Sequence, residues 1–135
     1  MATPVTTVAP KRILIMDDEI LVAGVLQDVL KHQGYGVELA SSGEAGLAAF
    51  RRERPDLILL DINMPGMSGL EVLKQIISEG HRDIPVIMVT AITDDASLST
   101  AMRDGAYAWL AKPFDINELG HVVDAALSRR PYRPR

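Results

Sequence analysis

Acidic, hydroxyl and cationic side chains stand directly after apolar segments of this sequence. The residues that share this placement are Asp17, Asp18, Asp61, Thr90 and Lys112. Carboxylates beside buried strands are costly unless a cation offsets their charge. If the apolar segments form parallel strands of one sheet, these side chains gather at a single edge. Oxygen donors next to a hydroxyl and an ammonium are typical of a site that binds Mg²⁺ and a phosphoryl group.

Hydrophobic periodicity predicts five strands that alternate with five helices. Arg12–Met16 is a short, continuous apolar run, typical of a strand covered on both faces. The other predicted strands are the weaker Gly36–Ala40, then Leu57–Leu60, Pro85–Val89 and Ala108–Ala111. The helical segments are Glu19–Gln33, a helix capped by Ser42 that ends before Pro55, Leu70–Glu79, Asp94–Asp104, and a last helix capped by Asp115. This alternation favours parallel strands with right-handed crossovers, and so a three-layer α/β/α sandwich.

The strand order follows from the acidic residues rather than from the alternation. Ligands of open α/β sheets bind beyond the carboxyl ends of the strands, where the strand order reverses. Asp17 and Asp18 follow the first strand and Asp61 follows the third. A reversal between these two strands gives the order 2-1-3-4-5, which places the three carboxylates side by side.

Composition limits the chain to one domain and excludes several kinds of chemistry. At 135 residues and 47% hydrophobic content, residues 11–128 can bury a core, with a leader at 1–10 and a basic tail or linker start at 129–135. The chain has no cysteine, which excludes disulfides and thiol chemistry. No apolar run reaches a membrane-spanning length, so we expect a cytoplasmic protein without membrane contact. The net charge of −4 argues against direct nucleic-acid binding by this domain.

From about Lys11 to Leu127, the chain resembles the receiver domain of two-component response regulators, which has a flavodoxin-like fold. The motifs that carry the resemblance are, in chain order, Asp17-Asp18-Glu19, Asp61-Ile62-Asn63-Met64-Pro65-Gly66, Gly69, Thr90-Ala91 and Lys112-Pro113-Phe114. Each motif alone is weak, but their order and spacing together are highly specific.

The resemblance implies a role for each acidic residue. Asp61 would be phosphorylated by a sensor histidine kinase or a phosphotransfer protein. Mg²⁺ would be held by Asp18, Asp61 and the backbone carbonyl of Asn63, with Asp17 acting mainly through water.

The resemblance also assigns the residues around the phosphoryl group. Thr90 would move toward that group, Lys112 would pair with it, and the small Ala91 would leave it access. The Lys112–Pro113 peptide bond would be cis. Trp109 stands where the family usually has Tyr or Phe, an aromatic side chain that turns inward when the hydroxyl residue moves. The larger indole is harder to bury, so the inward rotation is an open question.

The function implied is that of a signalling switch that assists its own phosphorylation and dephosphorylation, without being a turnover enzyme. Its output face would comprise the fourth helix, the fifth strand and the fifth helix, which would contact a downstream protein or output domain or form a homodimer on phosphorylation. A stand-alone receiver and the amino-terminal part of a longer regulator both fit the sequence.

Three alternative functions compete with this interpretation. A haloacid-dehalogenase-type phosphatase would need a second Asp two residues after its nucleophile, where this chain has Asn63. An FMN carrier would need a hydroxyl-rich phosphate loop in place of Asp17 and Asp18. An interaction module that never takes phosphate would not require the complete set of site residues.

Overall fold

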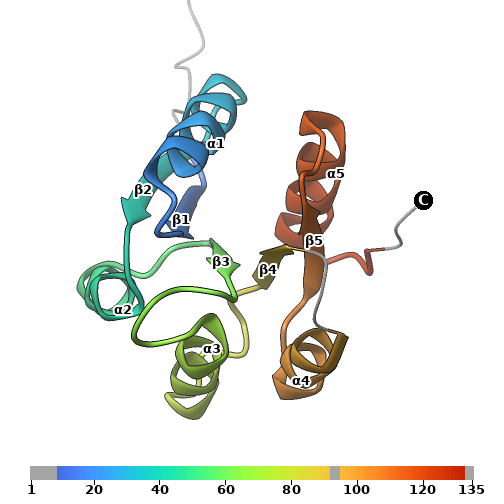
Figure 1. The fold of residues 1–135 in the computed structure, drawn as a ribbon. Helices are drawn as coiled ribbons and strands as arrows, with labels where there is room; N and C mark the ends of the chain where they lie inside the picture. The colour runs from blue at the N-terminus through green and yellow to red at the C-terminus, as the bar shows by residue number, and fades with distance from the viewer. Residues whose placement is uncertain (1–8, 92–94, 133–135) are drawn as a thin grey trace, which may run out of the picture.

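A computed structural model describes residues 9–91 and 95–132 of the chain. The strands are β1 (Arg12–Met16), β2 (Gly36–Ala40), β3 (Leu57–Asp61), β4 (Val86–Ala91) and β5 (Ala108–Lys112). The helices are α1 (Ile20–His32), α2 (Gly43–Arg52), α3 (Gly69–Ser78), α4 (Asp95–Asp104) and α5 (Ile116–Leu127). Strands and helices alternate along the chain as the periodicity predicts (Figure 1).

The five strands form one parallel sheet in the order β2-β1-β3-β4-β5. Helices α1 and α5 cover one face of this sheet, and α2, α3 and α4 cover the other (Figure 1). The predicted sandwich and the predicted strand order are both confirmed. The reversal of order lies between β1 and β3, whose carboxyl ends are therefore neighbours.

Two hydrophobic clusters bury the two faces of the sheet. Residues of β1 and β3 alternate between them: Leu14, Met16, Ile58 and Leu60 pack under α2, α3 and α4, whereas Ile13, Ile15, Leu57 and Leu59 pack under α1 and α5. Because successive side chains of a strand point to opposite faces, a strand covered on both sides must be apolar throughout. Burial of both faces stabilises the sheet and fixes the positions of the strand ends.

Helix caps fix where three of the helices begin. The Ser42 hydroxyl accepts a hydrogen bond from the backbone N–H of Ala45, and the Asp115 carboxylate accepts one from Glu118, so both predicted caps are confirmed. Ser68 caps α3 in the same way, which starts this helix at Gly69, one residue earlier than predicted.

The strands that carry the functional residues run further than their apolar patterns predict. Asp61 pairs in register with Val89, and Thr90 pairs with Ala111, so each belongs to its strand. The ladder also includes Lys112 as the last residue of β5. Backbone pairing continues past the last apolar side chain because it depends on the neighbouring strand and not on side-chain polarity.

The first residues after α5 contact the rest of the domain. Arg129 adopts the left-handed backbone conformation (φ 56°), which reverses the chain at the helix end. The Arg130 guanidinium then lies 2.6 Å from Oδ2 of Asp124, and its carbonyl accepts a hydrogen bond from the Tyr107 hydroxyl. Tyr132 packs against the cluster under α1 and α5. Two aromatic side chains and an ion pair therefore hold residues 129–132 of the predicted basic tail against the domain.

One predicted helix boundary can be compared with the structure only in part. The predicted start of the fourth helix, Asp94, lies outside the described residues, and the structure describes α4 from Asp95.

Within residues 9–91 and 95–132, no helix combines the length and the apolar character that crossing a membrane requires.

Candidate functional site

The predicted site residues meet at the carboxyl edge of the sheet. Asp17 follows β1 directly, Asp61 is the last residue of β3, Thr90 lies near the end of β4, and Lys112 ends β5. Parallel register aligns these strand ends, since Met16 pairs with Leu60 one residue before the two acids. The topology therefore brings together side chains that lie up to 95 positions apart in the sequence.

Three carboxylates converge at this edge. Oxygen atoms of Asp17, Glu19 and Asp61 all lie within 4.8 Å of one another. Asp17 and Asp61 are nearly inaccessible, with side chains 3% and 5% exposed, whereas the Glu19 side chain is 57% exposed. Asp18 is not part of this carboxylate group.

Glu19 contributes a carboxylate that the sequence patterns do not predict. It stands two positions after Asp17, in the turn that joins β1 to α1. No strand or helix periodicity covers this turn, so no local pattern indicates that Glu19 joins the other two acids. The backbone N–H of Glu19 also donates to Oδ1 of Asp17, at 2.9 Å, which fixes the turn between β1 and α1.

Lys112 supplies the cation that these acids require. Its Nζ lies 2.9 Å from Asp17 Oδ2, 3.0 Å from Glu19 Oε1 and 3.6 Å from Asp61 Oδ2. Burial by itself lowers the pKa of Lys112, but the hydrogen bonds to Asp17 and Glu19 and the charges of Asp61 and Asp17 outweigh it and raise the pKa to about 12. The ammonium is therefore charged at any physiological pH.

Burial raises the pKa of Asp61, which makes its carboxyl a weaker acid than usual. Removal of the carboxylate from water raises its pKa from 3.8 to about 6, against the lowering effect of the Lys112 charge. This value includes a raising contribution from the charge of Asp17 and a lowering one from the hydrogen bond that Asp61 Oδ1 accepts from the backbone N–H of Asn63, at 3.2 Å. At neutral pH most of the Asp61 carboxyl is ionised, which is the form that can act as a nucleophile.

The remaining predicted residues lie on β4 and β5. Thr90 is buried, and its hydroxyl donates to the carbonyl of Ala91 at 3.0 Å instead of to an acid of the site. Ala91 is exposed at the end of β4, so its methyl leaves the edge open. The Trp109 side chain is on the outside of the molecule, with 41% of the residue exposed. The Lys112–Pro113 peptide bond is cis.

The loop after β3 stays close to the site through a glycine. A Cβ on Gly69 would lie 2.2 Å from the Asp61 carbonyl oxygen, a distance that no side chain could tolerate. The Gly69 N–H donates to the carbonyl of Ile62, at 2.9 Å. Asn63, the residue after Ile62, is exposed and donates its backbone N–H to Oδ1 of Asp61. The first turn of α3 is thereby packed directly behind the Asp61 backbone.

The donor set fits a divalent cation of the magnesium type. Asp17, Glu19 and Asp61 supply carboxylate oxygens, and hard oxygen ligands from one or two carboxylates are what Mg²⁺ prefers. A single ammonium faces three carboxylates, so the cluster keeps an excess of negative charge for an additional cation. Asp17, Asp61 and the adjoining acids of the β1 turn could hold such an ion.

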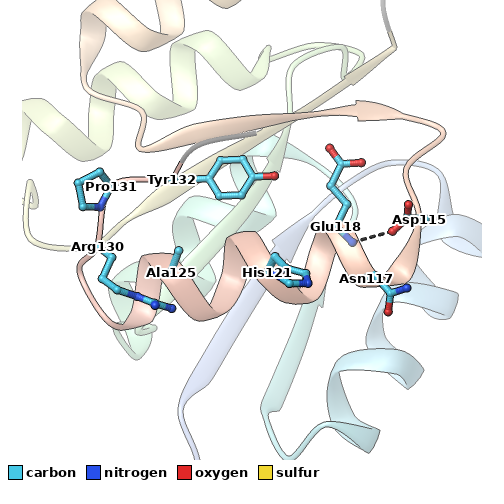
Figure 2. A pocket seen from close by; sticks show the side chains of 8 residues that line it. All are labelled: Asp115, Asn117, Glu118, His121, Ala125, Arg130, Pro131 and Tyr132. Atoms are coloured by element: carbon cyan, nitrogen blue, oxygen red, sulfur yellow. Dashed lines mark hydrogen bonds between the residues drawn. The ribbon is translucent and has the colours of Figure 1, made fainter. Parts of the chain in front are cut away.

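A separate groove of about 580 Å³ lies along α5 and the segment that follows it. Figure 2 shows Tyr132 and Arg130 at one side of this groove and Glu118 and His121 on the helix. The residues that line it are Asp115, Asn117, Glu118, His121, Ala125, Arg130, Pro131 and Tyr132. No predicted site residue lines this groove, so it is separate from the acidic edge.

Comparison with known proteins adds family information to this geometry. The profile described as "Response regulator receiver domain" matches residues 13–124. The chain is 40% identical over 119 residues to the regulatory protein AtoC of Escherichia coli K12, covering 88% of this chain and 26% of that protein. It is 36% identical over 124 residues to the DNA-binding response regulator MtrA of Mycobacterium tuberculosis H37Rv, covering 92% of this chain and 54% of that protein.

Solved structures show the same similarity. A CheY-like response regulator receiver domain protein from Methanospirillum hungatei superposes with a TM-score of 0.85 at 31% sequence identity. The match covers 89% of this chain and 95% of that one. The chain thus matches one solved receiver structure almost end to end, whereas it spans about a quarter and about half the length of the two curated relatives.

Proposed function

The chain belongs to the response regulator receiver domain family of two-component systems, and from this premise we propose that Asp61 is its phosphoacceptor. The observation that carries the proposal is the placement of the buried Asp61 carboxylate, whose Oδ2 lies 3.6 Å from the Lys112 ammonium at the edge where β1, β3, β4 and β5 end. The family is a signalling family and not one of turnover enzymes. Self-assisted phosphorylation and dephosphorylation are part of the proposal.

The proposed chemistry is transfer of one phosphoryl group. A carboxylate oxygen of Asp61 forms a bond to phosphorus while the bond between phosphorus and the donor atom breaks, and the donor leaves with that electron pair. The ionised state of Asp61 at neutral pH means that no proton has to be removed first. A sensor histidine kinase or a phosphotransfer protein is the proposed physiological donor.

Lys112 and Thr90 are proposed to stabilise the phosphoryl group. Lys112 is shared among three acids, and it can turn its ammonium to a phosphoryl oxygen without leaving the site. The Thr90 hydroxyl, which donates to the Ala91 carbonyl, can exchange that bond for one to the phosphoryl group. The open edge at Ala91 leaves space for the incoming group.

Mg²⁺ is the proposed cofactor, and Asp18, Asp61 and the backbone carbonyl of Asn63 are its proposed ligands, with Asp17 acting through water. When bound, the ion neutralises charge that develops on the phosphoryl oxygens. Because the backbone N–H of Asn63 already donates to Asp61, the loop after β3 is held close to the acid that it would assist.

The proposed output surface is formed by α4, β5 and α5. Exchange of the Thr90 hydrogen bond would pull on the end of β4, which leads toward α4, and Trp109 lies on the adjoining strand. We propose that this face contacts a downstream protein or output domain in the cytoplasm, with homodimer formation as an option. The MtrA relative is named as DNA-binding, but the acidic composition of this domain argues against direct nucleic-acid contact.

Chemical mapping tests the site of phosphorylation directly. The protein would be incubated with Mg²⁺ and acetyl phosphate, the acyl phosphate reduced with borohydride to homoserine, and the peptides sequenced. Homoserine at position 61 is the expected result. Homoserine at position 17 or 18 instead would contradict the proposal, and a parallel sample without acetyl phosphate serves as the control.

A further inference from the structure

Helix α2 approaches the end of β1 more closely than a side chain would allow. A Cβ placed on Gly46 would lie 2.3 Å from Sδ and 2.7 Å from Cγ of Met16, whose residue is completely buried. The Cγ atom is one bond from the Met16 Cβ, so rotation of the outer part of the side chain cannot remove this contact. Only a new χ1 rotamer or a shift of the strand end can remove it.

Close packing at the first turn of α2 restricts movement of the helix away from Met16. A Cβ on Gly43, one turn earlier, would lie 2.9 Å from Cγ2 of Val72 and 3.0 Å from Cβ of Met67. The first turn of α2 is thus packed against α3 and the loop after β3, and the Ser42 cap fixes its start. A larger side chain at position 46 would therefore displace Met16 rather than α2.

Met16 is the residue before Asp17, which makes its position matter for the site. Met16 pairs in register with Ala40 and Leu60, and the N–H of Asp17 continues this pairing with a 3.0 Å hydrogen bond to the Ala40 carbonyl. A shift of the Met16 backbone would move the Asp17 carboxylate, whose oxygens are held by the Glu19 N–H and by Lys112.

We propose that Gly46 and Met16 are a size-matched pair of positioning residues that sets the location of the Asp17 turn. Gly46 has no side chain, and the Met16 side chain of β1 occupies the space that a side chain at position 46 would need. Neither residue contacts the acids' oxygens in this role. The inference rests on the proposed function of the acidic edge as a site for Mg²⁺ and phosphoryl transfer.

Three variants test the pair. In Gly46→Ala, the displaced Met16 should move the backbone amide resonances of Asp17, Asp18 and Glu19 and weaken Mg²⁺ binding, measured by calorimetry, by roughly tenfold. The double variant Met16→Ala/Gly46→Ala removes both obstructing atoms, Sδ and Cγ, and should restore both measurements. Gly24→Ala on α1 is the matched control, because a Cβ there has nothing within 4 Å and should change neither.

A packing role without positioning gives a different pattern. If Gly46→Ala lowers the melting temperature but keeps the parent's Mg²⁺ affinity and amide resonances, the proposal is overturned. A double variant that stays impaired also overturns it. If Gly46→Ala fails to fold, the folded double variant decides: parental Mg²⁺ affinity supports the pair, and weakened affinity contradicts it.

The failure of the proposed function would be visible in the parent protein. A parent that binds no Mg²⁺ and accepts no phosphoryl group refutes the proposed function. The amide resonances of the metal-free variants would still decide whether Gly46 and Met16 position the turn.

Discussion

The ammonium of Lys112 lies 2.9 Å from Oδ2 of Asp17, which is 3% exposed. This contact joins the end of β5 to the turn after β1, across the two strands that lie between them. Two buried carboxylates at one edge would repel each other and lose their hydration, so the contact offsets a cost of folding as well as preparing the site. Lys112 is accordingly both a counter-ion of the unphosphorylated protein and the proposed partner of the phosphoryl group.

Replacing Lys112 by Met should expose this dual role. Without the ammonium, Asp17 and Asp61 are left buried and unpaired, and we expect the free energy of unfolding to fall by about 3 kcal/mol in metal-free buffer. Added Mg²⁺ should recover part of that loss, because a bound cation replaces the missing charge. Urea unfolding with and without Mg²⁺ measures both effects, and Lys74→Met on the exposed side of α3 is the control. A loss that is the same with and without Mg²⁺ would refute the counter-ion role.

The raised pKa of Asp61 predicts a specific dependence of stability on pH. A carboxyl with a folded-state pKa of about 6 and an unfolded value of 3.8 binds more protons when folded, so its contribution to stability declines as the pH rises from about 4 to about 6. Asp61→Asn removes this penalty. In metal-free buffer we expect the variant to match the parent near pH 4 and to be more stable by roughly 2–3 kcal/mol above pH 7.

Chemical denaturation of the parent and of Asp61→Asn across pH 4–8 measures this difference. A gap between the two proteins that stays constant over the range would show that burial does not shift the Asp61 pKa. Asp83→Asn, at an exposed carboxylate paired with Arg54, is the matched control.

Much of this edge could be predicted because its residues follow from strand patterns. The apolar runs before Asp17 and Asp61 are buried on both faces of the sheet, which makes them recognisable as strands, and the reversal of order between β1 and β3 follows from where the acids stand. The carboxylate contributed by Glu19 was not predicted, since its position depends on the turn after β1 and on the reach of Lys112. Neither is encoded in a local pattern.

Asp18 and Glu19, in the turn after β1, should differ in how much each contributes to Mg²⁺ affinity. Asp18 is the proposed direct ligand, whereas Glu19 is engaged by Lys112 at 3.0 Å and is largely exposed. We therefore expect Asp18→Ala to weaken Mg²⁺ binding by about tenfold or more, and Glu19→Gln to weaken it less, because Mg²⁺ depends on one or two carboxylates. Calorimetric titration with Mg²⁺ compares the two. The opposite ranking would make Glu19 the ligand in place of Asp18.

The single tryptophan offers an optical test of the switch. Trp109 is 41% exposed in the unphosphorylated protein, so a rearrangement of β4 and β5 should change the surroundings of its indole. We expect a shift in its fluorescence when beryllofluoride is added with Mg²⁺, and a smaller change with Mg²⁺ alone. An unchanged emission spectrum, with binding of the mimic shown independently, would remove Trp109 from the switch but leave Asp61 as phosphoacceptor.

The segment after α5 shows where sequence patterns lose their predictive value. The arginines of residues 129–135 predict a basic tail or the start of a linker. The hydrogen bond between Tyr107 and the Arg130 carbonyl is a contact between distant parts of the chain, next to the left-handed backbone turn at Arg129. Contacts of this kind depend on the completed sheet and cannot be inferred from composition.

Intact-mass measurement of Asp61→Asn beside the parent protein tests the central claim most directly. After incubation with Mg²⁺ and acetyl phosphate, the parent should gain about 80 Da, the mass of one phosphoryl group. The Asp61→Asn variant should gain nothing under the same conditions, while the folded control Asp83→Asn should be labelled as the parent is. A variant without the Asp61 carboxylate that still gains one phosphoryl group to the parental extent would contradict the account.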